Sequence, residues 1–228
     1  VLRLLVLGHL LMGVISAIIL PFAWARPMAP WQNWLWPLIG ASGFYVLGQA
    51  AFTIALKDAE ASRAAPLLGL KILVLAVITA GVLGRPLAAG QWLAAVLATG
   101  AAFVLNYSGG SMRPRAIVAI LAACVLYSLS DIHIRLLVDA LDLPLLRASV
   151  LGAVMCYALL GLLALPMLAM VLPVRWGDWR FAGPYALSWL GAMFLLYGAF
   201  ALAGVVLGNI VQSTRGLLSI GAGVLIAG

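Results

Sequence analysis

The chain has 228 residues, of which 66% are hydrophobic and 8% are charged, and its mean hydropathy is +1.19. Soluble domains carry about a quarter charged residues, so this composition excludes a water-soluble globular fold, a disordered chain and a coiled coil. Thirteen Lys and Arg against six Asp and Glu give a net charge of +7. The apolar excess must face lipid, and the chain is predicted to be an integral, multi-pass membrane protein.

The basic residues are spread over the junctions between apolar runs instead of forming one patch. This distribution is typical of loops beside lipid headgroups and argues against nucleic acid as a partner. The lipid bilayer and a small-molecule solute are the expected partners, and a homodimer stays open. Cys124 and Cys156 both lie inside apolar runs, which predicts two buried thiols and no disulfide.

Apolar runs of about 20 residues, long enough to cross a hydrocarbon core of about 30 Å, recur along the whole chain. They lack the alternation of β-barrel strands, so the predicted fold class is an all-α membrane protein, a polytopic bundle of about eight transmembrane helices. In chain order the predicted spans are 2–24, 34–56, 64–83, 87–107, 116–138, 145–172, 184–203 and 205–227.

The first span also has features of a secretory signal, because Arg3 precedes its apolar core and Ala23-Trp24-Ala25 follows it. Its core is longer than the usual signal core of about 7–15 residues, and further spans follow, so a transmembrane helix is favoured. The chain starts with Val, and we expect part of the natural N-terminus to be missing.

A weak internal repeat is found at an offset of 144 residues, which places 45–84 over 189–228 and Lys71 over Arg215. The identities in this overlay are near chance, but both copies hold two apolar spans with a short connection and a cation inside the second. An odd number of spans separates the copies, so they would insert with opposite orientation. Many secondary transporters have such inverted repeats, with a site near the midplane between them.

The segment 55–107 reads ALKDAEASRAAPLLGLKILVLAVITAGVLGRPLAAGQWLAAVLATGAAFVLNY. Its helix end, small-residue turn, Pro-containing helix, Gly-containing turn and Gln-Trp before a Gly/Ala-rich helix resemble the repeat of EamA-type transporters of the drug/metabolite transporter superfamily. A second, partial copy resembles it over 199–228. Arg85 stands where the family usually has Glu, so no role of that Glu is carried over.

This resemblance implies ten helices in two inverted five-helix repeats, of which the present spans would be helices two to nine. The chain then divides into a first EamA-like repeat at 1–108, without its first helix, and a second at 109–228, without its last. The implied function is a secondary transporter of a small organic metabolite, working by alternating access in the plasma (inner) membrane.

Lys71 and Arg215 are the most informative candidate site residues. A cation at a helix centre costs about 2.5–3.5 kcal/mol, so each needs a hydrated or paired environment. We expect both to line a central cavity that binds an anionic or zwitterionic substrate; snorkelling and structural pairing are the alternatives. Other polar or aromatic side chains predicted to line the substrate site are Gln212, Asn209, Gln49, Tyr45 and Trp189.

A second polar group lies near the end of the fifth span. Asp131 and Arg135 are four residues apart, which predicts a structural ion pair on one helix face. A functional alternative to the structural ion pair is that Asp131 and His133 are proton carriers that couple transport to a proton gradient. His9, within an apolar helix, is interpreted as a packing residue with a satisfied side chain.

The sequence lacks metal-ligand pairs at helical spacing, a paired-Cys motif, a phosphate-binding loop and a nucleophile motif. We therefore expect no catalytic residues, no metal, no cofactor and no enzymatic activity. The alternatives to a transporter are a noncatalytic membrane component or lipid-translocating subunit and, less favoured, an intramembrane transferase built on Asp131 and His133.

Overall fold

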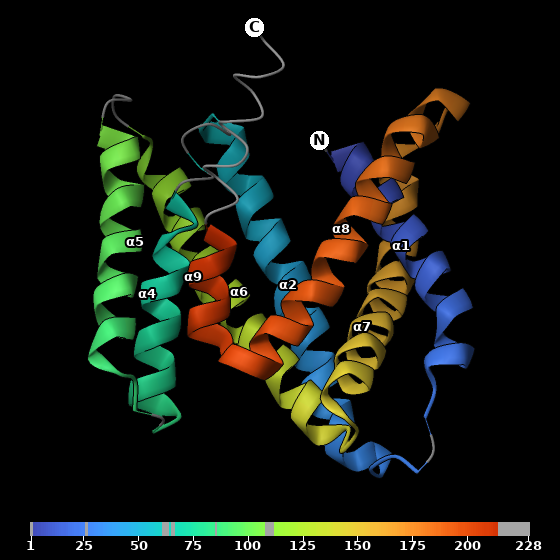
Figure 1. The fold of residues 1–228 in the computed structure, drawn as a ribbon. Helices are drawn as coiled ribbons and strands as arrows, with labels where there is room; N and C mark the ends of the chain where they lie inside the picture. The colour runs from blue at the N-terminus through green and yellow to red at the C-terminus, as the bar shows by residue number, and fades with distance from the viewer. Residues whose placement is uncertain are drawn as a thin grey trace, which may run out of the picture. The chain divides into compact units, whose positions relative to one another are not determined.

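The computed structural model describes residues 2–25, 27–60, 64, 67–84, 86–107 and 112–213, and all regular elements in these ranges are helical (Figure 1). The fold class predicted from the sequence, an all-α polytopic bundle, is confirmed. The elements are α1 (Leu2–Ala23), α2 (Trp31–Asp58), α4 (Leu70–Val77), the π-helical η1 (Ile78–Val82), α5 (Ala89–Tyr107), α6 (Pro114–Ala140), α7 (Leu145–Leu168), the 3-10 turn η2 (Ala169–Val171), α8 (Trp176–Ala203) and α9 (Val205–Ser213).

Five of the described helices are long and apolar enough to cross a membrane. They are Leu2–Ala23, Trp31–Asp58, Pro114–Ala140, Leu145–Val171 and Trp176–Ala203. Their apolar residues do not form a single narrow stripe, since lipid and the bundle interior are both apolar environments. Length and composition therefore support the multi-pass membrane protein that the sequence predicts.

Two helix starts differ clearly from the predicted spans, by at least six residues. The span expected at 184–203 begins at Trp176, because Pro184 is accommodated inside α8 and Asp178 supplies a favourable negative charge in the first turn. In the third span, Leu68 and Gly69 form a turn and α4 begins at Leu70. Lys71 is therefore the second residue of α4, not a residue seven positions into an uninterrupted helix.

The chain divides into two compact units. The first unit comprises Val1–Val46 and Ser130–Leu202, and the second comprises Leu47–Leu129 and Ala203–Gly228. The helices α2 and α6 each contribute residues to both. Each unit thus combines segments from both predicted repeats, 1–108 and 109–228. Compact units report packing rather than internal symmetry, and the division into repeats stays a prediction.

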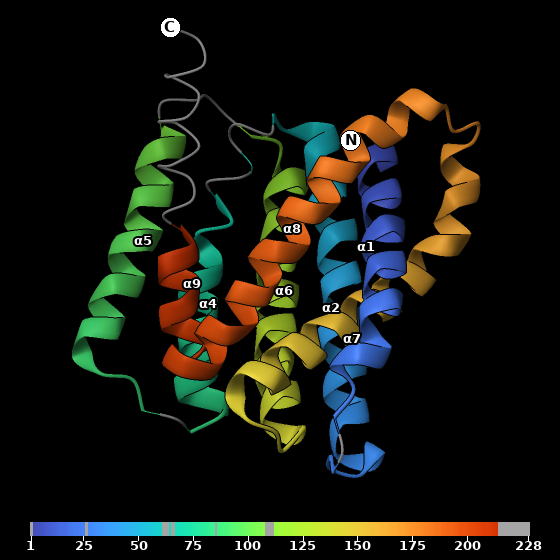
Figure 2. The ribbon, with the colours of Figure 1, turned by 45° about the vertical axis from the view of Figure 1, so that its right-hand side comes forward.

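In the first unit, α1 packs along α7 (Figures 1 and 2). The two backbones meet at Gly13 and Gly161, where a Cβ atom added to Gly13 would lie 2.5 Å from the Cα of Gly161. Small residues allow membrane helices this close approach, which maximises van der Waals contact. Beside this crossing lies a core made of Met12, Tyr157, Leu160, Ala186, Leu190 and Met193.

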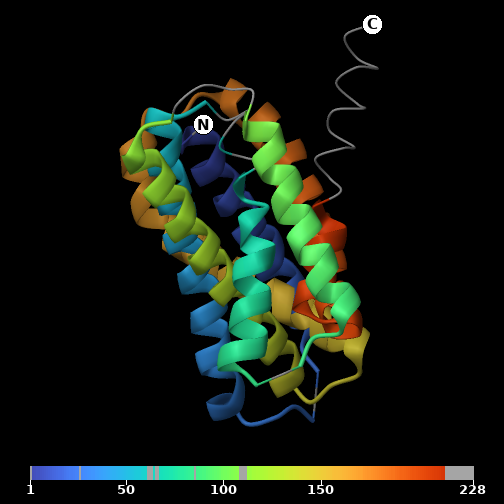
Figure 3. The same ribbon diagram turned by 90° about the vertical axis from the view of Figure 1, so that its left-hand side faces the viewer.

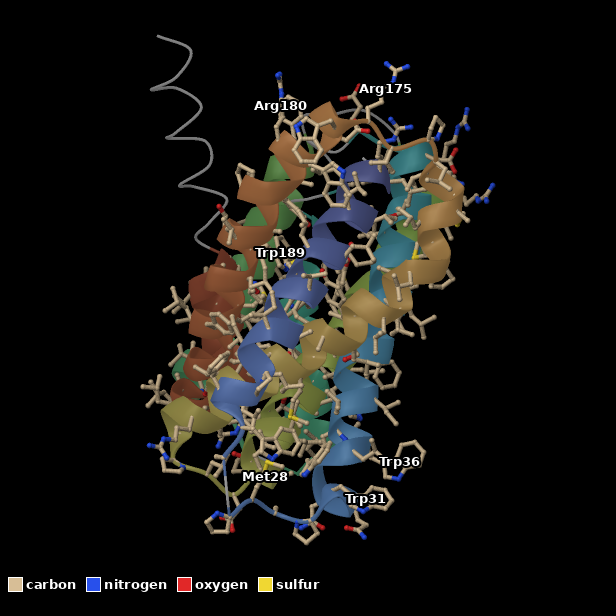
Figure 4. The ribbon with its side chains drawn as sticks, turned by 90° about the vertical axis from the view of Figure 1, so that its right-hand side faces the viewer. Met28, Trp31, Trp36, Arg175, Arg180 and Trp189 are labelled. Carbon is tan, nitrogen blue, oxygen red and sulfur yellow. The ribbon has the colours of Figure 1, made fainter. Side chains whose placement is uncertain are left out.

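The two ends of the first unit differ in chemistry (Figure 4). Arg175 and Arg180 lie at one end, and Trp31, Trp36 and Met28 lie at the opposite end. Trp31 and Trp36 are both exposed. Tryptophan is enriched at membrane–water interfaces, so this end has the composition of an interfacial belt.

In the second unit, α4, α5 and α9 pack against one another (Figure 3). A buried core is formed by Ala55, Ala64, Leu67, Ile120 and Cys124. Asp58 at the end of α2 contacts Arg113 at 2.9 Å and Arg115 at 3.9 Å, which ties the end of α2 to the start of α6. Both cysteines of the chain are free and buried, as predicted.

Candidate functional site

The predicted site residues are distributed over both units, and each unit is described separately. The first unit contains Tyr45, Asp131, His133 and Trp189, and the second contains Gln49, Lys71, Asn209 and Gln212. Arg215 lies outside the described residues. The expectation that Lys71 and Arg215 line one cavity therefore stays a prediction.

Four helices of the first unit bring together a group that we call the histidine–aromatic cluster: His9, Tyr45, Tyr157, Tyr185 and Trp189. His9 Nε2 lies 3.1 Å from the Tyr45 hydroxyl, and the Trp189 indole N–H donates to the Tyr157 hydroxyl at 2.8 Å. The rings of Tyr185 and Trp189 are 5.8 Å apart between centroids. The hydrogen bonds thus join α1 to α2 and α7 to α8, and Tyr45, Tyr185 and Trp189 all pack against the core that contains Tyr157.

The hydrogen bonds of His9 determine which ring nitrogen carries the proton. His9 Nδ1 lies 2.7 Å from the carbonyl oxygen of Leu5, which can only accept, so Nδ1 carries the hydrogen. In the neutral imidazole Nε2 is then an acceptor, and the Tyr45 hydroxyl donates to it. The direction of the hydrogen bond between α1 and α2 is therefore fixed.

The histidine–aromatic cluster is largely buried in apolar surroundings. His9 is 9% exposed and Tyr157 is 2% exposed, and Met12 and Leu190 belong to the same packed core. Buried polar groups are costly unless they are paired, and the His9 and Tyr157 side chains both have partners. The cluster offers aromatic faces and hydroxyl groups and contains no permanently charged side chain.

Tyr45 and Trp189 are predicted site residues, whereas the sequence predicts His9 to be a packing residue and gives no role to Tyr157 or Tyr185. Tyr185 had a usable signal, since it lies four residues before Trp189 and shares its helix face. Tyr157 had none, because it is embedded in an apolar run and only tertiary packing reveals its partner.

Asp131 and His133 have different neighbours in the first unit. Asp131 is 5% exposed and lies close enough to Tyr197 of α8 for an electrostatic interaction. The His133 ring packs against Phe44 of α2, at 5.2 Å between centroids, and against Gly40, where a Cβ atom would collide with it. Residues two apart on a helix point in nearly opposite directions, which explains the different neighbours.

The predicted ion pair between Asp131 and Arg135 is wrong. Arg135 Nε contacts Asp139 at 2.9 Å, and its Nη1 donates to the carbonyl oxygens of Phe200, at 2.7 Å, and Ala201 near the end of α8. The free carbonyls at a helix end attract a guanidinium, so the side chain of Arg135 extends toward α8. Asp139, one turn further along α6, becomes its carboxylate partner.

In the second unit, Gln49, Lys71 and Tyr127 form a group that we call the lysine–tyrosine cluster. The Tyr127 hydroxyl donates to Gln49 Oε1 at 2.8 Å, and Lys71 Nζ lies 5.9 Å from the centroid of the Tyr127 ring. Gly48 makes room for this ring, since a Cβ atom there would lie 2.8 Å from it. The ammonium group of Lys71 therefore lies over an aromatic face, a favourable cation–π arrangement.

The two polar candidates of α9 differ in burial. Asn209 is 3% exposed, and its amide donates to the carbonyl oxygen of Val205 at 2.8 Å, one turn earlier in the same helix. Gln212 is partly exposed. Its predicted partner, Arg215, lies outside the described residues. In the ranges that the structure describes, no group of three or more His, Cys, Asp or Glu side chains could hold a metal ion.

Residues 3–107 match the EamA-like transporter family. The resemblance predicted from the sequence is thereby confirmed for this part of the chain, which includes His9, Tyr45, Gln49 and Lys71. A comparison with curated proteins finds no match. Together with the apolar helices, the family match supports an integral, multi-pass membrane protein.

Proposed function

We propose, on the premise that residues 3–107 belong to the EamA-like transporter family, that this protein is a secondary transporter of a small organic metabolite. It would work by alternating access in the plasma (inner) membrane, and it would make or break no covalent bond. The observation that carries the proposal is the pair of polar clusters held inside apolar helices. Polar groups are costly in such surroundings and are typically functional there.

The end of the matched segment supports the proposed division into repeats. The match stops at residue 107, next to the proposed boundary between repeats 1–108 and 109–228. A family match confined to one repeat is what two diverged copies would give. In this proposal Lys71 belongs to the first copy and Arg215 to the equivalent position of the second.

The lysine–tyrosine cluster supports an anionic or zwitterionic substrate. Lys71 supplies a point charge for a carboxylate or phosphate group, and Gln49 adds an amide within the same cluster. The substrate contacts proposed from the sequence also include Tyr45 and Trp189. The remaining proposed contacts are Asn209, Gln212 and Arg215.

Coupling to a proton gradient is proposed through Asp131 and His133. Asp131 is a buried carboxyl group within α6, and intramembrane carboxyl and imidazole groups serve as proton carriers in transporters. Replacing either group alone would then change the pH dependence of uptake without abolishing substrate binding.

Uptake into proteoliposomes tests the substrate site. Lys71→Gln removes the charge and keeps much of the side-chain length, and we expect at least tenfold slower uptake of an anionic substrate, a loss of about 1.4 kcal/mol. A panel of anionic, zwitterionic and cationic metabolites, with and without a proton gradient, identifies the substrate first. The matched control is Lys57→Gln, an exposed lysine in the last turn of α2.

Equal abundance in the membrane has to be shown for all three proteins. Normal uptake by Lys71→Gln would remove Lys71 from the site. Absence of transport for the whole panel by the unmodified protein would favour the noncatalytic membrane component instead.

A further inference from the structure

One end of the first unit carries three arginines, which we call the arginine rim: Arg3, Arg175 and Arg180. The starts of α1 and α8 lie side by side there (Figure 2), and Figure 4 shows Arg175 and Arg180 projecting from this end. The proposed transport site does not account for these side chains.

A single carboxylate, Asp178, lies within the arginine rim. Its Oδ2 atom contacts Arg3 Nη1 at 3.3 Å and accepts the backbone N–H of Arg175 at 2.9 Å. The side chains of Arg175 and Arg180 contact no carboxylate in the part of the chain that the structure describes. Three guanidinium groups and one carboxylate leave a surplus of two positive charges.

Large apolar side chains stand beside the arginine rim. Trp176 is 90% exposed and Phe181 is 60% exposed, and the Arg180 guanidinium lies 4.6 Å from the centroid of the Phe181 ring. Guanidinium groups next to exposed aromatic rings suit the membrane–water interface, where the charged headgroups of the lipids adjoin their apolar acyl chains. In water, by contrast, such rings would remain unfavourably hydrated.

The opposite end of the first unit differs in its charge pairing. There Arg135 is paired with Asp139, and Arg147 follows Asp142 at the turn between α6 and α7. Among the described residues of this end, two arginines are matched by two aspartates. Among the described residues of the first unit, the positive surplus therefore lies at the arginine rim.

We infer that the arginine rim binds the phosphate groups of anionic phospholipids, with Trp176 and Phe181 placed among the adjoining lipid carbonyls and acyl chains. Guanidinium groups bind phosphate in a bidentate manner, which a surface of scattered lysines would not do. Asp178 positions the rim, because it holds the start of α8 next to Arg3. The proposal does not depend on what the protein transports.

The test compares lipids in nanodiscs of phosphatidylcholine with and without phosphatidylglycerol. We expect phosphatidylglycerol to raise the Tm of the unmodified protein by about 2–4 °C, and the double variant Arg175→Gln/Arg180→Gln to lose at least half of this shift. The matched control is Arg147→Gln, an exposed arginine in the first turn of α7, which should keep the shift. The shift in Tm is measured for each protein between the two lipid compositions, so differences in basal stability between the proteins cancel.

Three results would overturn the inference. One is an equal lipid-dependent shift in the unmodified protein, the double variant and the control. Another is the absence of any shift in the unmodified protein. The last is an equal shift caused by inorganic phosphate in pure phosphatidylcholine, which would assign the rim to a free anion. If the double variant does not fold, the single variants Arg175→Gln and Arg180→Gln replace it, each with an expected partial loss.

Discussion

The hydrogen bond between Tyr45 and His9 shows how one hydroxyl group links two membrane helices. His9 Nε2 is a buried acceptor, and the Tyr45 hydroxyl satisfies it at 3.1 Å. Hydrogen bonds between membrane helices contribute about 0.6–2 kcal/mol to stability. This is less than the cost of leaving a polar group unpaired in hydrocarbon would suggest. The link is therefore of moderate strength, and a single substitution should reveal it.

Tyr45→Phe should lower the stability of the protein by about 0.6–2 kcal/mol, because it removes the donor and leaves His9 Nε2 unpaired. Unfolding in detergent, followed by tryptophan fluorescence, measures this loss. Tyr185→Phe is the matched control, since no hydrogen bond of the Tyr185 hydroxyl is described and its ring contacts remain. Equal losses in both variants would show that the hydroxyl of Tyr45 contributes nothing specific.

At the scale of residues, the sequence predicts which side chains are unusual but not which ones meet. Gln49 and Lys71 were selected because an amide or an ammonium needs partners in an apolar helix, and both contact Tyr127. The predicted pairing of Asp131 with Arg135 is wrong, because spacing along α6 does not reveal the carbonyl groups of α8 to which Arg135 donates. Contacts between helices depend on tertiary packing, which helical periodicity does not contain.

The pairing of α1 with α7 depends on two glycines that leave the backbones in contact. Gly13→Ala would place a methyl group 2.5 Å from the Gly161 Cα, which forces the helices apart. Overpacking of this kind costs about 1–3 kcal/mol. We expect Gly13→Ala to lower the midpoint of unfolding in denaturant accordingly.

The matched control for Gly13→Ala is Gly191→Ala in α8, where a methyl group would meet nothing within 4 Å. Alanine is the better helix former by about 1 kcal/mol, so the control should be neutral or slightly stabilising. The two variants differ only in surroundings. A stable Gly13→Ala protein would mean that α1 and α7 are not held at this crossing.

Helices were predicted well as elements and less well at their ends. The hydropathy of the long apolar runs predicts α1, α2, α6, α7 and α8, since the bilayer sets the length of a span. Pro184 was interpreted as a helix start, whereas α8 begins at Trp176. Proline is a weaker boundary signal within a helical bundle, where neighbouring groups can satisfy the freed carbonyl.

At the scale of the whole molecule, the organisation into two units could not be read from the order of the spans. The first unit takes the beginning of α2 and the end of α6, and the second takes the other parts of these helices. A repeat predicted from sequence follows the chain, whereas compact packing gathers segments that are distant in it. Both descriptions can hold for one protein.

The two cysteines provide a probe for each unit, because Cys156 lies in the first and Cys124 in the second. Both thiols are buried, so a maleimide can react only after local or global opening. In the single-cysteine variants Cys124→Ala and Cys156→Ala, we expect labelling at least about 100-fold slower than in denaturant. Rapid labelling of either thiol in the native protein would contradict the described packing of its unit.

The contact of Arg135 with the carbonyls of Phe200 and Ala201 makes the length of α8 depend on a side chain of another helix. Without that guanidinium, these carbonyl groups in the final turn of α8 would lack a hydrogen-bond donor, and the end of α8 would fray. A variant of Arg135 would thus shorten a helix in which it does not lie. Helix content and local protection from hydrogen exchange would register this loss.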